Sequence, residues 1–260
     1  MSGIERGREE FKQFNISCQY YLYDYNSTSF KKMKAKLLKQ KHDGLLFAPI
    51  FYDESILFLD EYKKLNTPIV MIDSNIKHTA ISASIGQDAF KSGYLAGKLI
   101  SLGSTENKHI LIIKITQEIE STSIYQQRIQ GFYSFFENNK KTSIIKISEI
   151  ILTNKLQELD VKIFQEIDSI FVPNSRSYII AEFLKNNNIN NINIVGFDIL
   201  KENIMYLKEG IINFLINQKP EIQGYLGVEY LYKKIVLKEN IDEKLNLPLE
   251  IILKENYLHD

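Results

Sequence analysis

The stretch TPIVMIDSNIKHTAISASIGQDAFKSGYLAGKLI (residues 67–100) contains two short apolar runs followed by an amphipathic segment. The runs 68–72 and 83–85 are rich in the β-branched residues typical of strands, whereas 90–102 carries apolar residues at helical spacing. Strands that alternate with helices form parallel sheets, because a parallel strand pair needs a long crossover connection. The stretch therefore predicts an α/β fold.

The same alternation continues on both sides of this stretch. We expect further strands at 18–23, 44–48, 109–115, 143–147, 169–172, 191–196 and 212–216. We expect helices at 29–40, 54–65, 123–138, 156–166, 176–186, 202–209 and 220–237. Residues 3–14 also read as a helix, with no strand before it, so the first strand of a doubly wound sheet is expected upstream of Met1.

Length and composition limit the function classes. The 260 residues, 44% of them hydrophobic, can bury a core as one large domain or as two linked lobes. The 32 basic residues balance 32 acidic ones, so the chain lacks the positive field that sequence-independent DNA binding requires. The single cysteine, Cys18, excludes an intrachain disulfide and a thiolate zinc cluster. No apolar run reaches the roughly 18 residues of a membrane helix.

Polar side chains recur where apolar runs end. They are Asp73, Asp88, Asn174, Asp198 and Gln218. Loops at the carboxyl ends of parallel strands converge, and ligands of open α/β sheets bind there. Each of these residues could instead cap a helix or stabilise a turn, because Asp and Asn are common in both places.

The chemistry of these side chains suits a polyhydroxylated ligand. Carboxylates accept hydrogen bonds and amides both donate and accept, which matches adjacent hydroxyl groups. Arg128, early in the helix expected at 123–138, could add a forked donor. Phe197 precedes Asp198 and is our first candidate for stacking on a sugar face, with Phe51, Tyr52 and Tyr125 as alternatives and a core role open for each.

Features of a catalytic site are not found in the sequence. His42, His78, His109 and His259 lack metal-binding spacing, and no nucleophile elbow, phosphate loop or dinucleotide fingerprint follows a strand. We therefore expect a protein that is not an enzyme and that uses no cofactor and no metal ion.

Six stretches carry a family resemblance: DGLLFAPI (43–50), TPIVMIDS (67–74), IGQDAFKSGYLAGKLI (85–100), RIQGF (128–132), NINIVGFD (191–198) and NQKPEIQGYLG (217–227). Their order resembles that of LacI/GalR regulators and related periplasmic sugar-binding proteins, over nearly the whole chain. The resemblance implies the type I periplasmic-binding-protein fold, with two doubly wound lobes joined by a three-segment hinge that closes on a ligand. The lobes are then 1–87 plus 219–247 and 88–218 plus 248–260.

The resemblance also implies roles for individual residues. Asp73, Arg128, Asn174, Asp198 and Gln218 match ligand-contacting positions, and Asp88 matches an acidic position near the hinge. Ser74 and Ser175 depart from the pattern, since many relatives carry a charged residue there. The expected upstream strand would supply one further wall of the pocket.

The function implied is the effector-binding and dimerisation domain of a cytoplasmic LacI-type transcriptional regulator. Its ligand would be a sugar or sugar derivative, its partner a second copy of the chain, and DNA would be held by an upstream helix-turn-helix headpiece outside residues 1–260. The lysine-rich helix at 29–40 is a solvated surface or an interface. The alternatives are an exported sugar-binding protein of a transporter and the periplasmic sensor domain of a membrane kinase.

Overall fold

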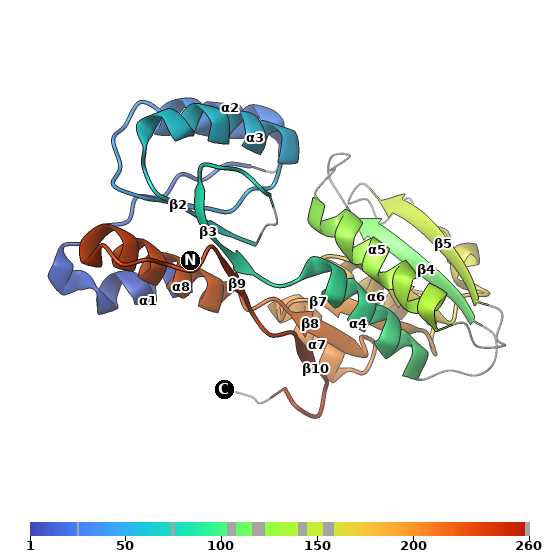
Figure 1. Ribbon diagram of the computed structural model, residues 1–260. Coiled ribbons are helices and arrows are strands. Elements are labelled where there is room, and N and C mark those ends of the chain that lie inside the picture. The colour runs from blue at the N-terminus through green and yellow to red at the C-terminus, as the bar shows by residue number, and fades with distance from the viewer. Residues whose placement is uncertain are drawn as a thin grey trace. The chain divides into compact units, whose positions relative to one another are not determined.

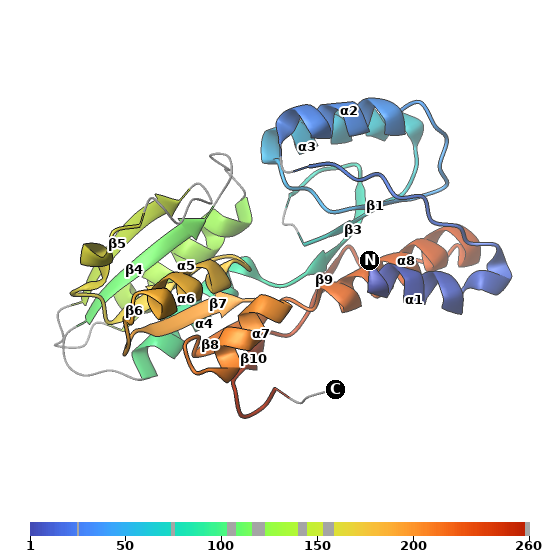
Figure 2. The same cartoon turned by 180° about the vertical axis from the view of Figure 1, so that it is seen from behind.

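The structure is a computed structural model of the chain, and it describes residues 1–24, 26–73, 76–102, 108–115, 123–139, 145–152 and 159–257. The chain divides into two compact units (Figures 1 and 2). Unit 1 contains Met1–Gln87 and Lys219–Pro248, and unit 2 contains most of 88–218 and the residues from Leu249 onward. Within the described ranges, no helix is both long and apolar enough to cross a membrane.

Unit 1 is built on a parallel four-stranded sheet with the order β1-β2-β3-β9. Its strands are β1 (Leu45–Phe47), β2 (Ile69–Ile72), β3 (Ile81–Gly86) and β9 (Lys244–Asn246). Its helices are α1 (Ser2–Glu10), α2 (Ser27–Leu37), α3 (Tyr52–Tyr62) and α8 (Pro220–Tyr232), with 3-10 turns at Lys12–Phe14 and Lys63–Leu65.

The alternation of side chains along β2 divides the core of unit 1 between two helical layers. Ile69 and Met71 pack with apolar residues of α2 and α3, whereas Val70 packs on the α8 side with Tyr230. Successive side chains of a strand point to opposite faces, so a continuous apolar run such as PIVMI suits a strand covered on both sides. The helices on the two faces of the sheet are visible in Figure 1.

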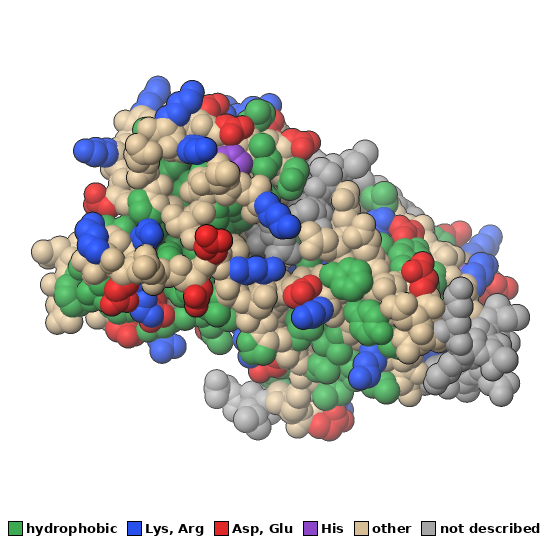
Figure 3. Space-filling model, viewed as in Figure 1, with side chains coloured by type: hydrophobic (Ala, Val, Ile, Leu, Met, Phe, Trp, Pro, Cys, Tyr) green, Lys and Arg blue, Asp and Glu red, His purple; other side chains and the backbone are tan. Residues whose placement is uncertain are grey.

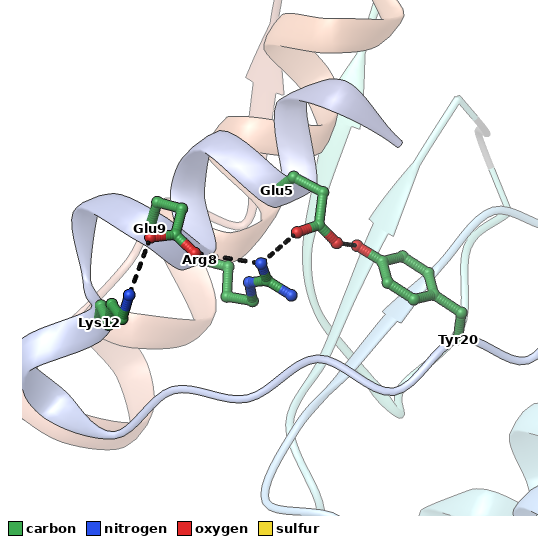
Figure 4. A network of polar contacts seen from close by, with 5 residues as sticks. All are labelled: Glu5, Arg8, Glu9, Lys12 and Tyr20. Atoms are coloured by element: carbon green, nitrogen blue, oxygen red, sulfur yellow. Dashed lines mark hydrogen bonds and ion pairs between the residues drawn. The ribbon is translucent and has the colours of Figure 1, made fainter.

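Helix α1 is held against α8 and against the extended segment that follows it. A Cβ atom on Gly3 would lie 1.8 Å from the carbonyl oxygen of Glu221, so only glycine permits this approach of the two helices. Tyr20 donates to Glu5, which also pairs with Arg8 at 2.8 Å (Figure 4). The N-terminal helix therefore forms part of unit 1.

Unit 2 contains a six-stranded sheet with the order β10-β8-β7-β6-β4-β5, in which only the β10–β8 pair is antiparallel. The strands are β4 (Lys108–Ile115), β5 (Ile145–Leu152), β6 (Ser169–Phe171), β7 (Asn193–Phe197), β8 (Phe214–Asn217) and β10 (Glu250–Ile252). The helices are α4 (Ala89–Leu102), α5 (Ser123–Asn138), α6 (Ser177–Asn186) and α7 (Lys201–Lys208).

Two apolar clusters cover the faces of this second sheet. Ile110 and Ile112 of β4 pack with α4 and α5, while Leu111 and Ile113 pack with α6 and α7. A parallel sheet covered by helices on both faces is the doubly wound arrangement. The α/β fold expected from the sequence is therefore confirmed.

The strand expected at 18–23 is wrong. Residues 16–24 are extended but pair with no strand of the described chain, and Leu22 is 77% exposed. Side chains hold the segment instead: the Tyr21 hydroxyl lies 2.8 Å from Nε2 of His42, and Tyr23 donates to the carbonyl oxygen of Ala48 at 3.0 Å. Tyr21 and Tyr23 pack on the core beneath α2 and α3, which accounts for apolar residues in this run.

Other differences concern short or capped elements. Of the helix expected at 156–166, residues 156–158 lie outside the described part, and Val161–Phe164 is a 3-10 turn that begins where Asp160 accepts from the amide of Lys162 at 3.0 Å. The helix expected at 220–237 ends at Tyr232 and continues as a π-turn over Lys233–Leu237. Strands β9 and β10, three residues each, were not expected, because neither carries a recognisable apolar run.

Candidate ligand-binding site

The candidate site in unit 2 lies where three neighbouring parallel strands end. Strands β6, β7 and β8 are adjacent in the sheet and run in the same direction. Asn174, Asp198 and Gln218 come one to three residues after them. The sheet order therefore places three residues that are widely separated in the sequence at the carboxyl ends of neighbouring strands.

Gln218 connects Asp198 to Arg128. Its side-chain amide donates to Asp198 Oδ2 at 2.6 Å, and its backbone amide donates to Oδ1 at 3.2 Å. Its Oε1 accepts from Nη2 of Arg128. The result is a row of guanidinium, amide and carboxylate groups within unit 2.

Arg128 is buried and its guanidinium is fixed from two further sides. Nη1 donates to the carbonyl oxygen of Pro173 at 2.7 Å, and the guanidinium carbon lies 3.9 Å from the centre of the Phe197 ring. Gly93 of α4 makes this placement possible, because a Cβ there would lie 1.8 Å from the carbonyl oxygen of Arg128. The arginine is thus held by the packing of α4 against α5 as well as by its polar contacts.

Burial affects the ionisation of Asp198. It raises the pKa of this carboxyl group above its ordinary value, while the charge of Arg128 and the hydrogen bonds from Gln218 act in the opposite direction. Burial removes water from this carboxylate, and the protein replaces only part of those hydrogen bonds, so an additional hydrogen-bond donor would stabilise the charged form. A ligand hydroxyl group could supply that donor.

Phe197 is fully buried beneath the guanidinium of Arg128. The ring supports the arginine and exposes no face in this structure, so a stacking role toward a sugar gains no support. Among the alternatives, Phe51 packs against Phe30 in unit 1, and Tyr52 is 37% exposed at the start of α3.

Asn174 is buried, and backbone groups occupy both ends of its amide. Its Nδ2 donates to the carbonyl oxygen of Ile115 at 2.7 Å, and its Oδ1 accepts from the amide of Arg176 at 3.0 Å. These contacts connect the loop after β6 to the end of β4. Direct ligand contact by Asn174 remains a prediction, and the geometry observed is that of a loop-stabilising residue.

Asp88 forms the cap of α4. Its Oδ1 accepts from the amide of Lys91 at 2.9 Å, and its carbonyl oxygen accepts from the amide of Ser92. This is the helix-capping geometry that was the open alternative for every strand-end residue. A ligand contact by Asp88 is untested.

Asp73 belongs to unit 1, where it follows β2. Its backbone has a φ of 48°, and its amide donates to Oε1 of Gln223 at 2.8 Å and to the carbonyl oxygen of Ile85. Gln223, in α8, is buried. The side chain of Asp73 is exposed, and Ser74, which follows it, lies outside the described residues.

Two buried amides, Asn203 and Gln223, were not identified from the sequence. Each lies on the buried side of a helix and hydrogen-bonds to a strand-end aspartate. The available signal was a polar residue at an apolar helical position, as with Asn203 beside Ile204. Such a residue is unfavourable unless tertiary contacts satisfy its amide.

The lysine-rich helix α2 carries a mixed charged surface. Lys31 pairs with Glu54 at 2.9 Å and Lys34 pairs with Glu61 at 2.6 Å. Figure 3 shows acidic side chains among the basic ones on the α2 and α3 side of unit 1. This agrees with a solvated face, and its use as an interface remains a prediction.

No group of three or more His, Cys, Asp and Glu side chains that could hold a metal ion occurs among the described residues. The polar groups brought together in unit 2 are donors and acceptors suited to an uncharged polar ligand.

Residues 4–239 match the family described as periplasmic binding protein domain, and the chain belongs to this family. It is 30% identical over 223 residues to the sucrose operon repressor of Lactococcus lactis, covering 84% of this chain and 64% of that protein. It is 23% identical over 197 residues to the ribose import binding protein RbsB of Haemophilus influenzae, covering 71% of this chain and 63% of that protein. The chain therefore spans less than two thirds of the length of each of these relatives.

Solved structures give the same fold. A Bacteroides fragilis protein described as a LacI transcriptional regulator has a TM-score of 0.88 and 26% identity, over 99% of this chain and 92% of that chain. GanP, a glucose-galactose binding protein from Geobacillus stearothermophilus, has a TM-score of 0.84 and 22% identity, over 98% of this chain and 92% of its own. The type I periplasmic-binding-protein fold and the family resemblance are therefore confirmed.

Proposed function

We propose that this chain is the effector-binding domain of a LacI-type transcriptional regulator that acts in the cytoplasm and binds a small sugar. The observation that carries the binding part is the row of Arg128, Gln218 and Asp198. A guanidinium donates, a carboxylate accepts and an amide does both, so the row is complementary to neighbouring hydroxyl groups of a sugar ring. We further propose that the domain does no covalent chemistry on its ligand and needs no cofactor.

The regulator assignment is supported by two relatives. One is the Lactococcus lactis sucrose operon repressor, and the other is the Bacteroides fragilis protein described as a LacI regulator. On this proposal the chain forms a homodimer, and DNA is bound through a headpiece outside residues 1–260. Closure of the two units on the ligand is part of the same proposal.

An exported sugar-binding protein is the second candidate. It is favoured by the similarity to the ribose import binding protein and by the fold shared with GanP. The two candidates predict the same kind of site but differ in assembly and location. A periplasmic sensor domain would share the location of the exported protein.

A thermal-shift screen tests the binding part. The sugars to use are those in the names of similar proteins: D-ribose, sucrose, D-glucose, D-galactose, D-arabinose and D-allose. A ligand at about 100 times its Kd should stabilise the native state by about 2.7 kcal/mol. The shift should be lost in Arg128→Ala and Asp198→Ala and kept in Lys185→Ala, which removes an ion pair with Glu209 and a cation–π contact with Tyr206. A sugar that binds both site variants normally would refute the site, and no response to any sugar would refute the ligand class.

Sedimentation equilibrium separates the two candidates. The regulator proposal predicts a dimer, whereas a monomer at high concentration would favour the exported protein. The gene sequence upstream of Met1 gives a second test, since a helix-turn-helix segment supports the regulator and a secretion leader opposes it. Recovery of an unchanged sugar after incubation, measured by NMR, tests the absence of catalysis.

A further inference from the structure

Asn203, in α7, is fully buried and connects the two loops that carry the candidate site residues of unit 2. Its Nδ2 donates to the carbonyl oxygen of Ser175 at 2.9 Å, in the loop after β6. The same group donates to the carbonyl oxygens of Phe197 at 3.0 Å and Asp198 at 3.1 Å, after β7. One side chain thus joins the ends of two adjacent strands.

The acceptor side of the same amide completes helix α6. Asn203 Oδ1 accepts from the hydroxyl of Ser177 and from the amide of Tyr178, each at 2.9 Å. Arg176, at the N-cap position of α6, makes no capping hydrogen bond with its side chain. Asn203 therefore caps α6 from another helix, a task that a residue at the helix start usually performs.

The conformation of Asp198 makes these contacts relevant to binding. Its φ is 65°, in the left-handed region that non-glycine residues occupy at a cost in energy. A donor to its carbonyl oxygen and a donor to that of Phe197 hold the peptide group on each side of the residue. The direction of the Asp198 carboxylate toward Gln218 depends on this turn.

We infer that Asn203 is a positioning residue of the ligand site, acting through Asp198 and the loop after β6. This inference deepens the proposed function and rests on it for the affinity measurement only. Without the Asn203 amide, the carbonyl groups of residues 175, 197 and 198 would hydrogen-bond to other partners, and this side chain would no longer join the two loops. A single buried amide shared between them keeps the carboxylate in place before a ligand arrives, which lowers the cost of binding.

Two variants separate the donor role from the acceptor role. Asn203→Ala removes both sets of contacts. Asn203→Asp keeps an acceptor for Ser177 and Tyr178 but removes the donor to the three carbonyl oxygens, so it disturbs the loops while leaving the cap of α6. Leu207→Ala is the matched control, because Leu207 is fully buried in the same helix and belongs to the apolar core that α6 and α7 form on the sheet.

Amide hydrogen exchange followed by NMR on the whole chain tests the inference without a ligand. The amide of Gln218, which donates to the Asp198 carboxylate, should exchange at least tenfold faster in both Asn203 variants than in Leu207→Ala. The amide of Tyr178 should lose protection in Asn203→Ala and keep it in Asn203→Asp. If the Gln218 amide changes no more than in the control, the inference is wrong.

Calorimetry with the sugar that gives the largest thermal shift completes the test. At a temperature where all variants are folded, both Asn203 variants should bind it at least tenfold more weakly, and Leu207→Ala should bind it within about twofold of the unmodified chain. If Leu207→Ala weakened sugar binding as much as the Asn203 variants do, Asn203 would only stabilise the fold, and the inference would be wrong. Failure of every sugar in the screen would refute the ligand class, and the exchange data would still decide the role of Asn203.

Discussion

Asp198 in unit 2 and Asp73 in unit 1 occupy similar places in their sheets. Each follows a buried parallel strand, each has a positive φ, 65° and 48°, and each is contacted by a buried amide from a helix later in the chain. The amides act on opposite sides of the aspartates. Asn203 donates to the carbonyl oxygen of Asp198, whereas Gln223 accepts from the backbone amide of Asp73.

The environments of the two carboxylates also differ. The Asp198 side chain is partly buried and held by Gln218, whereas Asp73 is exposed at the surface of unit 1. The same backbone conformation thus presents one carboxylate that is held by Gln218 and one that is exposed at the surface of its unit. We expect these differences to appear in stability, in affinity, in pH dependence and in tolerance to substitution.

The largest difference should be in stability. Asn203→Ala should lower the free energy of unfolding by about 3 kcal/mol, because it removes a buried hydrogen bond to the carbonyl oxygen of Phe197 and partly buried ones to backbone groups of Ser175 and Tyr178. Gln223→Ala should cost about 1 kcal/mol, since the amide of Asp73 keeps its second acceptor on Ile85. Urea denaturation of both variants measures this, and equal losses would show that the two amides are equivalent.

Ligand affinity should separate the two aspartates next. Asp198→Ala removes an oriented acceptor and should weaken sugar binding about 100-fold, equivalent to about 2.7 kcal/mol. Asp73→Ala should weaken it about tenfold or less, because a hydrogen bond from a ligand to an exposed carboxylate contributes less than one to a buried carboxylate. Titration calorimetry gives both values. A larger loss for Asp73 would reverse the order of the two residues.

The pH dependence should involve Asp198. Its carboxyl has an ordinary pKa of 3.8, which burial raises in the folded state, so the native protein binds this proton more tightly than the unfolded chain. The free energy of unfolding should therefore decrease as the pH rises from 3.8 through the raised pKa, and then level off.

Asp198→Asn removes this titration. The variant should be more stable than the unmodified chain at pH 7, and the difference should shrink as the pH falls toward 4, which urea denaturation at several pH values would measure. A difference that is constant with pH would show that burial does not govern this carboxyl group.

The smallest effect should come from the backbone at Asp73. Asp73→Gly should leave the free energy of unfolding unchanged within about 0.5 kcal/mol, because glycine adopts a φ of 48° without strain. Asp73→Ala should lower it by about 1 kcal/mol, since alanine tolerates the left-handed region less well than aspartate. Thermal unfolding compares the pair. A glycine variant less stable than the alanine variant would show that strain is not the controlling factor.

Much of the architecture could be predicted from local patterns. The apolar runs at 68–72 and 109–115 predicted strands β2 and β4, because a strand covered on both faces needs no polar alternation. The strand expected at 18–23 was wrong: Tyr21 and Tyr23 pack on the core, but a strand also needs a neighbouring strand, and pairing is not encoded in one segment. Strands β9 and β10 are the opposite case. Each has only three residues and no recognisable apolar run, so each is identified as a strand only by its pairing, with β3 and β8 respectively.

The sequence by itself determined the α/β class, the family and the polar residues that follow strands, since these depend on composition, short-range spacing and motif order. Only the tertiary structure decided what those residues do. The order of β6, β7 and β8 and the packing of α5 on this sheet brought Asp198, Gln218 and Arg128 into contact and placed Phe197 beneath the arginine. The position of β4 beside β6 gave Asn174 the carbonyl oxygen of Ile115 as its partner. Hydrogen-bond partners depend on which distant segments fold together, so buried amides such as Asn203 become interpretable only in the folded protein.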